Sequence, residues 1–364
     1  MALLHESLDL RKKMSSWVNF EVRKQKSTLL LMAKVSKITG SGLVAKPTYR
    51  VTNWKAYNQG LVKRGSLTLW LDSDVEKTWY FQGKHQRGAQ FDYSDTCILM
   101  ILTLRSVFLL PFRQTQGFVQ SVLDLAKIGL KVPCYTQVCR RQAGLKVPPK
   151  ISERLKNGEN IYVVADSSGL KVFGEGEWKV RQHGYSKRRT WRKIHLGVDE
   201  KTGEIVAQTL TENSVDDAEI VPEMVKQAQK NGVKVGRFAA DGAYDKRKCY
   251  DVLLENGIEP IIPPREDAQY WFDKKGEPLP HPRNFALMEI DEGGQNENRK
   301  QWKINANYHR RSLSETTFFR WKVTFGDKLA ARKLNNQKTE AALKSAILNT
   351  FIQMAKPVSV RNAA

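Results

Sequence analysis

The sequence contains little cysteine. Four cysteines in 364 residues, at positions 97, 134, 139 and 249, are too few and too scattered for a framework of disulfides. We therefore expect a protein of a reducing compartment. Cys134 and Cys139 are close in the sequence, but no Cys/His pair at zinc-finger spacing completes a metal site with them. We interpret both as thiols of the hydrophobic core.

Long apolar segments are also missing from the sequence. The longest apolar run, residues 97–110, carries Arg105 and is too short to cross a bilayer. The first residues, MALLHESLDLRKKMSS, place charges where a signal peptide requires an apolar stretch. These two observations predict a cytoplasmic location.

Acidic residues are scarce relative to basic ones. The chain has 60 Lys and Arg against 38 Asp and Glu, which gives a formal net charge of +22 and a pI near 9.8. An excess of this size attracts polyanions, and nucleic acid is the commonest polyanion available to a soluble protein. A generally basic, ribosome-like or membrane-surface protein is the alternative that charge leaves open. The hydrophobic content of 41% is that of a globular protein.

The composition divides the chain into three parts. Residues 1–50 are basic and weakly patterned, and we expect a flexible N-terminal segment in which Met32 offers a second start. Residues 51–150 show helical patterns, at 53–65, 94–110, 114–130 and 135–145. We predict a helical DNA-binding region here. The last two helices, with Pro133 between them, are compatible with a helix-turn-helix or with two ordinary packed helices.

Residues 151–356 alternate between strand and helix patterns. Short apolar runs predict strands at 161–166, 191–199, 205–212, 235–241 and 259–264, and helical patterns lie at 215–232 and 243–257. The turn EKTG between the second and third of these strands predicts a hairpin. This order predicts an α/β fold with a mixed sheet flanked by helices, as in ribonuclease-H-like folds among others.

Two aspartates stand at the ends of predicted strands. Asp166 ends the run IYVVAD, and Asp241 ends VGRFAAD. A carboxylate at the end of a buried strand loses hydration, so a functional demand is one explanation for its presence. Ligands of open α/β sheets collect beyond the carboxyl ends of the strands. The alternative is a turn aspartate in each case, since DSSG and DGAYD are both good turn sequences.

Glu315 is the third candidate acid. On a helix, Tyr308, Arg311, Glu315 and Lys322 share one face, because they are separated by three, four and seven residues. An exposed Arg311–Glu315 pair is the simpler interpretation, but it gives no reason for the rest of the stripe. Aromatic residues at positions 318, 319, 321 and 325 predict that the helix also packs into a core. We therefore expect the charged stripe to face a polar site.

Carboxylates that converge on one point suit divalent metal ions. Hard oxygen ligands hold Mg²⁺ or Mn²⁺. Two such ions roughly 3.5–4 Å apart activate a water or hydroxyl and stabilise the leaving oxygen of a phosphodiester. Basic neighbours of the acids then receive DNA phosphates. Asp166, Asp241 and Glu315 are thus predicted to bind two Mg²⁺ ions, with Mn²⁺ as a substitute.

The same residues carry a resemblance to a protein family. VVADSSGLKV is similar to the family block that holds a first Asp, and AADGAYD is similar to the block that holds a second. YHRRSLSETTFFRWK fits the family pattern of Tyr, Arg, Glu and Lys at fixed spacing. The chain, from about residue 50 to 360, closely resembles bacterial insertion-sequence transposases of the DDE class. Within that class it is most similar to the insertion-sequence-five group of the insertion-sequence-four superfamily.

The resemblance implies a ribonuclease-H-like core and a DNA transposase. Three acids match the family's catalytic, metal-binding triad: Asp166, Asp241 and Glu315. Three neighbours match residues that contact phosphates at the transposon end: Tyr308, Arg311 and Lys322. The family's reaction is hydrolysis at the element's ends, followed by attack of the 3′-hydroxyl on target DNA. The resemblance also implies double-stranded DNA as partner, recognition of inverted repeats by the helical region, a homodimer on DNA and a nucleoid-associated location.

Basic and aromatic residues are interleaved between positions 174 and 193. Basic side chains follow a DNA backbone, and aromatic ones stack on exposed bases. We predict DNA contacts from four of them: Lys187, Arg188, Arg189 and Arg192. A solvated hairpin tip is the alternative. His183 and His195 are expected to form structural hydrogen bonds rather than to bind metal.

The segment between the second Asp and the Glu holds rival acids. Glu289, Asp291 and Glu292 are rival third ligands, but they lie outside a basic, aromatic helix face. Residues 273–302 are polar and are expected to form a small hairpin or a helix. Two other functions stay open, a two-metal nuclease that does not join DNA and a domesticated, non-catalytic DNA-binding regulator. The presence of all three acids argues against the regulator.

Overall fold

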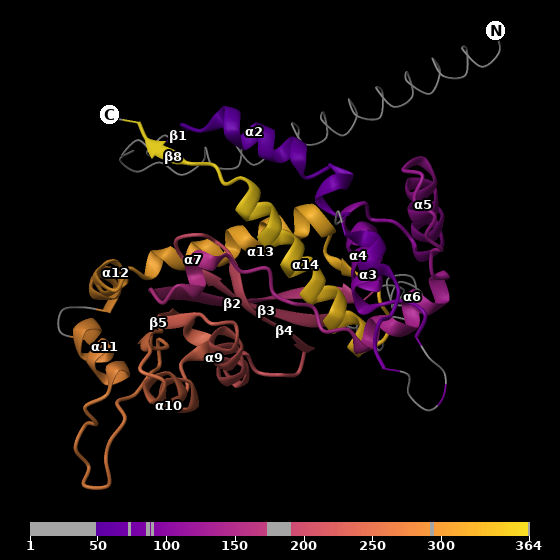
Figure 1. Cartoon of the computed structure of the whole chain (residues 1–364). Coiled ribbons are helices and arrows are strands. Elements are labelled where there is room, and N and C mark those ends of the chain that lie inside the picture. Colours follow the sequence, from indigo (N-terminus) through magenta and orange to yellow (C-terminus); the bar gives the residue numbers. More distant parts are fainter. Residues whose placement is uncertain are drawn as a thin grey trace, which may run out of the picture. The chain divides into compact units, whose positions relative to one another are not determined.

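The computed structural model describes residues 49–71, 74–84, 88, 91–172, 191–291 and 295–362 (Figure 1). The described residues fall into two compact units, residues 49–52 with 358–362, and residues 53–357. In the first unit, β1 (Tyr49–Val51) pairs antiparallel with β8 (Ser359–Arg361). The predicted flexible segment therefore ends in a short strand, and its residues 1–48 lie outside the described part of the chain.

The second unit is built on a six-stranded sheet. β2, β3 and β4 pair antiparallel, whereas β5 and β6 run parallel to β2. The strands follow the order β4 (Ile205–Glu212), β3 (Trp191–Asp199), β2 (Asn160–Val172), β5 (Lys234–Ala239) and β6 (Glu259–Ile261), and β7 (Lys328–Leu329) pairs with the end of β2. This is the strand order of a ribonuclease-H-like fold, so the predicted fold class is confirmed.

The hairpin between β3 and β4 has the predicted position, and both strands have the predicted bounds. The turn is fixed by the Asp199 carboxylate, which accepts hydrogen bonds from the amide and the hydroxyl of Thr202 at 2.7 and 2.8 Å. Gly203 follows with φ +78, a conformation that residues with a side chain rarely adopt.

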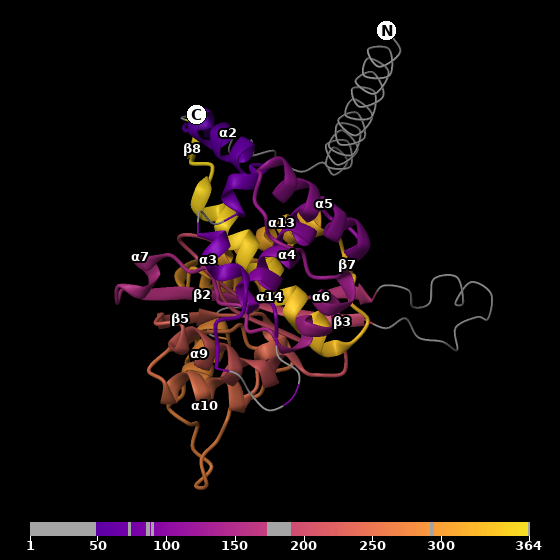
Figure 2. The same cartoon turned by 45° about the vertical axis from the view of Figure 1, so that its right-hand side comes forward.

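Helices cover both faces of the sheet (Figures 1 and 2). α9 (Val221–Lys230) and α10 (Arg247–Glu255) share one core with Val163 and Ala165 of β2. α13 (Ser312–Phe325) and α14 (Leu334–Met354) share the other core with Leu170 of β2. Alternate residues of a strand point to opposite faces. Asp166 therefore faces α13, and Ser167 faces the side of α9.

Helices α3 (Val75–Trp79), α4 (Asp95–Val107), α5 (Phe112–Leu125) and α6 (Tyr135–Arg141) of the N-terminal region contribute residues to the second of these cores. Ser94 caps the N-terminus of α4, and its hydroxyl accepts from the Cys97 amide at 3.0 Å. α5 and α6 are joined by residues 126–134, a longer connection than the three- or four-residue turn of a helix-turn-helix. α2 (Trp54–Lys63) precedes these helices, and the short α7 (Glu153–Lys156) follows the region and contributes Leu155 to the first core. The DNA-binding role of this region stays a prediction.

In the described part of the chain, no single helix is long and apolar enough to cross a membrane. α4 and α5 pass that test only together, as a pair bent by 108°.

The four cysteines are free thiols. Cys97 and Cys249 are buried, but Cys134 is exposed and Cys139 is half-buried. The interpretation of Cys134 as a core thiol is wrong, because this residue lies on the loop that precedes α6, where its sulfur contacts the Thr136 hydroxyl at 3.0 Å.

The segment between Asp241 and Glu315 forms both a small hairpin and helices. Phe272 and Pro278 make a β-bridge, and α11 (Pro282–Asp291) and α12 (Gln295–Asn305) follow. At its root, the Arg283 guanidinium donates to the Asp245 carboxylate at 2.7 Å, and both side chains are almost fully buried. Two ions withdrawn from water require such close pairing. The root of the segment is thus tied to the loop that carries Asp241.

Candidate active site

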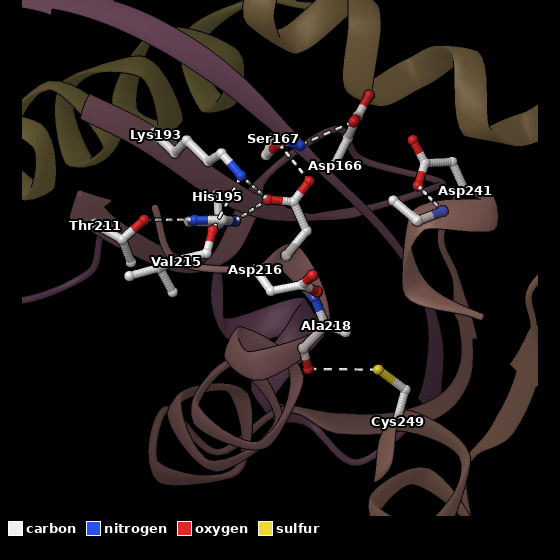
Figure 3. Close-up of polar contacts among 12 residues, drawn as sticks. Asp166, Ser167, Lys193, His195, Thr211, Val215, Asp216, Ala218, Asp241 and Cys249 are labelled. Carbon is white, nitrogen blue, oxygen red and sulfur yellow. Dashed lines mark hydrogen bonds and ion pairs between the residues drawn. The ribbon is translucent and has the colours of Figure 1, made fainter. Parts of the chain in front are cut away.

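Asp166 lies within β2 rather than at its end. The prediction that the strand stops at Asp166 is wrong, because residues 167–171 continue to pair with residues 191–195 of β3. The parallel neighbour β5 does end at this level, since Val164 lies opposite Ala239. Asp166 and Asp241 each follow those two residues by two positions. The two aspartates therefore stand on adjacent parallel chains at the same edge of the sheet (Figure 3).

The Asp166 carboxylate is held on both oxygens. Its Oδ1 accepts from the Ser167 amide at 2.8 Å, and its Oδ2 accepts from Arg311 Nη1 at 3.0 Å and from the Ser314 hydroxyl at 3.2 Å. The side chain is 16% exposed. Burial raises the pKa of Asp166, against the lowering effect of these hydrogen bonds and of the Arg311 charge. A carboxylate that has lost hydration in this way is stabilised when a cation binds to it.

Ser314 was not predicted to belong to the site. It is fully buried, and its hydroxyl lies between the Arg311 carbonyl and Asp166. The signal in the sequence was its place three residues after Arg311, on the helical turn that faces β2. A lone serine next to a charged stripe is too common for that signal to count by itself.

Asp241 caps the short turn that follows β5. Its Oδ1 accepts from the Ala243 amide at 2.9 Å, at the start of the 3₁₀ turn η5 (Gly242–Tyr244). DGAYD therefore does form a turn, as the alternative interpretation predicted. The capping bond uses only Oδ1 of Asp241, so Oδ2 can bind another partner. Tyr244, the last residue of η5, is fully buried. Burial and then the charges of Asp217, Asp166 and Asp241 raise the pKa of its hydroxyl far above the usual value. The negative charges of the three acids thus act together on this buried hydroxyl.

Glu315 lies on α13, but the predicted continuous helix is interrupted. Tyr308 to Arg311 form a 3₁₀ turn, η6 (Tyr308–Arg311), and α13 begins after it. Arg311 Nη2 still reaches Glu315 Oε1 at 3.1 Å across one turn. The Glu315 side chain is 62% exposed. The core prediction is confirmed for Phe318, Trp321 and Phe325 and is wrong for Phe319, whose side chain is exposed.

Tyr308 is placed by a small core of its own. It packs with Trp302 of α12, at 6.0 Å between ring centroids, next to Ala239, Ile261 and Ile290. The Arg311 guanidinium lies 5.9 Å from the ring centroid. Burial raises the pKa of Tyr308 to about 12, so the phenol keeps its proton at neutral pH and can donate a hydrogen bond.

Arg311 is the central group of the site. Burial acts to lower its pKa, but the neighbouring Tyr308, Asp166, Asp241 and Glu315 outweigh burial and raise it. One guanidinium therefore bonds two of the predicted acids and lies within electrostatic reach of the third. Arg311 was predicted to contact DNA phosphate. In this structure it compensates the charge of the carboxylates.

The three acids are assembled around Arg311 rather than around a common point. Within the described residues, no group of three or more His, Cys, Asp or Glu side chains is close enough to hold a metal ion. The donor set nevertheless fits a divalent cation. Carboxylate oxygens are the ligands that Mg²⁺ and Mn²⁺ prefer, and the charge that Arg311 neutralises here is the charge that such an ion would neutralise.

The other predicted site residues lie apart from this group or outside the described residues. Lys322 is exposed on α13, about two turns beyond Glu315. Arg192 donates to the Gln337 side chain of α14 at 3.0 Å.

Two of the rival acids lie on α11. Glu289 is exposed and accepts from Asn305 at 2.9 Å, and Asp291 ends the helix. Five predicted residues lie outside the described part of the chain: His183, Lys187, Arg188, Arg189 and the rival acid Glu292.

His195 makes the structural hydrogen bond that was expected of it. The ring is fully buried in β3, and Nε2 lies 2.9 Å from the Thr211 hydroxyl of β4. Burial lowers the pKa of His195 to about 4, so the imidazole is neutral at physiological pH.

This burial predicts a loss of stability in mild acid. The folded pKa lies below the unfolded value of about 6.5, so the contribution of neutral His195 is complete above that pH and is lost as the pH falls towards 4. Between pH 7.5 and pH 5 the expected loss is about 2 kcal/mol. Urea unfolding at both pH values measures it, and His195→Gln removes this share of the pH dependence. His309→Gln, at an exposed histidine, keeps the parent's slope. Equal slopes in parent and His195→Gln would contradict the assignment.

Comparison with protein families identifies the class to which this site belongs. A family model described as a transposase DDE domain matches residues 158–350, and another with the same description matches residues 62–175. The first match spans more than half of the chain, so the chain belongs to the DDE transposases. It is an enzyme of that class, which moves DNA segments.

Solved transposase structures are also similar to the chain. They include a piggyBac transposase synaptic complex with hairpin DNA (11% identity, covering 84% of this chain and 77% of that one, TM-score 0.39). A Drosophila P element transposase strand transfer complex matches with 9% identity over 83% and 86% of the two chains and a TM-score of 0.27. A Mos1 mariner paired end complex with Mn matches with 12% identity over 85% and 94% and a TM-score of 0.21. The family assignment rests on the family models.

Proposed function

We propose that this DDE transposase binds the terminal inverted repeats of a bacterial insertion sequence, hydrolyses the phosphodiester bonds at its ends and joins the freed 3′-hydroxyl groups to target DNA. Within the class we assign it to the insertion-sequence-five group of the insertion-sequence-four superfamily. The observation that carries the proposal is the contact of Arg311 with Asp166 and Glu315, because it brings the strand of the first Asp and the Tyr-Arg-Glu-Lys helix together.

Asp166, Asp241 and Glu315 would hold two divalent ions, Mg²⁺ with Mn²⁺ as a substitute. Such ions, when bound, activate the attacking oxygen and stabilise the leaving oxygen of a phosphodiester. The remaining tasks belong to the side chains. Ser314 and the Ser167 amide orient the Asp166 carboxylate. The Asp241 carboxylate is fixed by its cap on η5.

The basic residues hold the DNA in this proposal. Tyr308 donates through its protonated hydroxyl, and Arg311 and Lys322 receive phosphates along one side of η6 and α13. Four further residues extend the contact: Lys187, Arg188, Arg189 and Arg192. The helical region 51–150 recognises the repeat, two copies of the chain hold two ends, and the protein acts in the bacterial cytoplasm on the nucleoid. The net charge of +22 supports a polyanionic partner.

A strand-transfer assay tests the proposal. The protein is incubated with Mg²⁺, a plasmid target and linear DNA carrying the sequences that flank its own gene. Cleavage at the element's ends followed by joining to the plasmid is the expected result. Cleavage without joining would instead indicate a two-metal nuclease, and end binding without cleavage would indicate a regulator. Either outcome would overturn the proposal.

A further inference from the structure

A second polar network lies on the face of β2 opposite to Arg311. Ser167, the residue after Asp166, lies opposite His195 of β3 and points to the side of α9. There it meets the acid at the start of the 3₁₀ turn η4 (Asp217–Ile220). Figure 3 shows Ser167, Lys193 and His195 converging on this point, with Asp166 just above. The predicted function leaves this network without a role.

Asp217 is the centre of the network. Its Oδ2 accepts from the Ser167 hydroxyl at 3.0 Å, and its Oδ1 accepts from Lys193 Nζ at 3.1 Å. Lys193 also donates to the Val215 carbonyl at 3.0 Å, which holds its ammonium in place. His195 Nδ1 lies 3.8 Å from the same carboxylate oxygen. The Asp217 side chain is only 17% exposed, so these charge-assisted contacts are partly shielded from water.

Ser167 connects this network to the active site. Its hydroxyl is bonded to Asp217 on one face of the sheet, while its amide donates to Asp166 Oδ1 at 2.8 Å towards the other face. The other Asp166 oxygen is held by Arg311 and Ser314. Arg311 must release Asp166 before a metal ion or a DNA phosphate takes its place. The Ser167 amide and Ser314 are then the groups that still fix the carboxylate.

We infer that Asp217 is a positioning residue for the metal-binding carboxylate of Asp166 and acts through Ser167. Lys193 fixes Asp217, Asp217 fixes the Ser167 side chain, and the Ser167 amide fixes the direction of Asp166 Oδ1. This inference rests on the proposed role of Asp166 as a metal ligand. Mutation of a group that hydrogen-bonds and orients a metal ligand typically costs roughly 10- to 100-fold in metal affinity or activity.

Binding of Mn²⁺ to the full chain without DNA tests the inference, with free Mn²⁺ followed by electron paramagnetic resonance. Asp217→Ala and Ser167→Ala are each expected to weaken Mn²⁺ binding about tenfold. The double variant is expected to lose no more than either single one, because both changes break the same link. Asp217→Asn, whose amide oxygen still accepts from Ser167, keeps more affinity than Asp217→Ala. DNA affinity stays at the parent value in all of them, and the rate of end cleavage falls with Mn²⁺ affinity.

The neighbouring acid provides a matched control. Asp216 pairs with Lys246 at 2.6 Å and caps the Ala218 amide, without contact to Ser167. Asp216→Asn keeps that cap and is expected to bind Mn²⁺ as the parent does. Parental Mn²⁺ affinity in Ser167→Ala and Asp217→Ala, or additive losses in the double variant, would overturn the inference. If Asp166→Asn also binds Mn²⁺ like the parent, the metal site itself is misassigned, which separates failure of the proposed function from failure of the positioning role. Ser167→Ala removes a single half-buried hydroxyl, so the test survives poor folding of Asp217→Ala.

Discussion

Replacing Asp166 with asparagine is expected to lower the rate of DNA end cleavage by about 10³-fold, since several kcal/mol of charge stabilisation depend on its ionised carboxylate. Asparagine keeps the size of the side chain and can still accept from the Ser167 amide, so the fold is preserved. Glu315→Gln is expected to have an effect of similar size. Single-turnover cleavage of a DNA carrying the element's end measures both, with binding followed separately by gel shift.

Glu259→Gln is a suitable control for these variants. Glu259 is an exposed acid at the start of β6, paired with Arg237 at 2.7 Å, and its loss is expected to leave cleavage unchanged. Full cleavage by Glu315→Gln would show that another acid completes the site. Glu289, on α11, is then the next residue to replace.

Replacing Arg311 with alanine is expected to change two affinities in opposite directions. Without DNA, Mn²⁺ binds roughly 30- to 100-fold more tightly, because the ion no longer competes with two charge-assisted hydrogen bonds worth about 1.5 kcal/mol or more each. The bond from Arg311 to Glu315 contributes less of this energy than the bond to Asp166, because the Glu315 side chain is largely exposed to water. DNA binding weakens at the same time, because a phosphate contact is removed. Calorimetry or paramagnetic resonance measures the first change and gel shift the second.

Lys322→Ala separates the two roles of Arg311. Lys322 lies exposed about two turns further along α13, so its removal is expected to weaken DNA binding and leave Mn²⁺ affinity as in the parent. Unchanged Mn²⁺ affinity in Arg311→Ala would show that the guanidinium does not compete for the metal site. The carboxylates would then have to bind the ion while Arg311 remains in place.

The strands of the fold were predictable where local pattern and turn chemistry agree. β3 and β4 were predicted to the residue, because a buried run on each side of EKTG leaves one register for the hairpin. β2 was predicted too short, because the SSG that follows Asp166 looks like a turn. Its continuation depends on pairing with β3, and such pairing is a tertiary effect that residues 167–171 do not reveal by themselves.

The site was predictable in its residue types and less so in its contacts. Asp166 and Asp241 were identified by their positions at the ends of apolar runs, and the Tyr, Arg, Glu and Lys residues by their spacing and the family pattern. The structure brings Asp166, Arg311 and Glu315 into direct contact. The Arg311–Glu315 pair was the simpler interpretation of the sequence and is present in the structure, whereas the bond from Arg311 to Asp166 was not predicted. A sequence gives the charge of a side chain but does not say which of several opposite charges it meets. The link between Lys193 and Asp217 depends in the same way on how η4 packs beside β3.

The buried Asp245–Arg283 pair has a consequence for the evolution of chain length. This ion pair links the start of α11, in the segment between Asp241 and Glu315, directly to the loop of Asp241. The exposed turn between Phe272 and Pro278 lies in the loop that this ion pair closes, between Asp245 and Arg283 (Figure 1). Residues added at the turn would therefore extend into solvent without stretching the path from Asp241 to Glu315. The fold thus has a position at which residues can be added or removed while the spacing of the candidate site residues is kept.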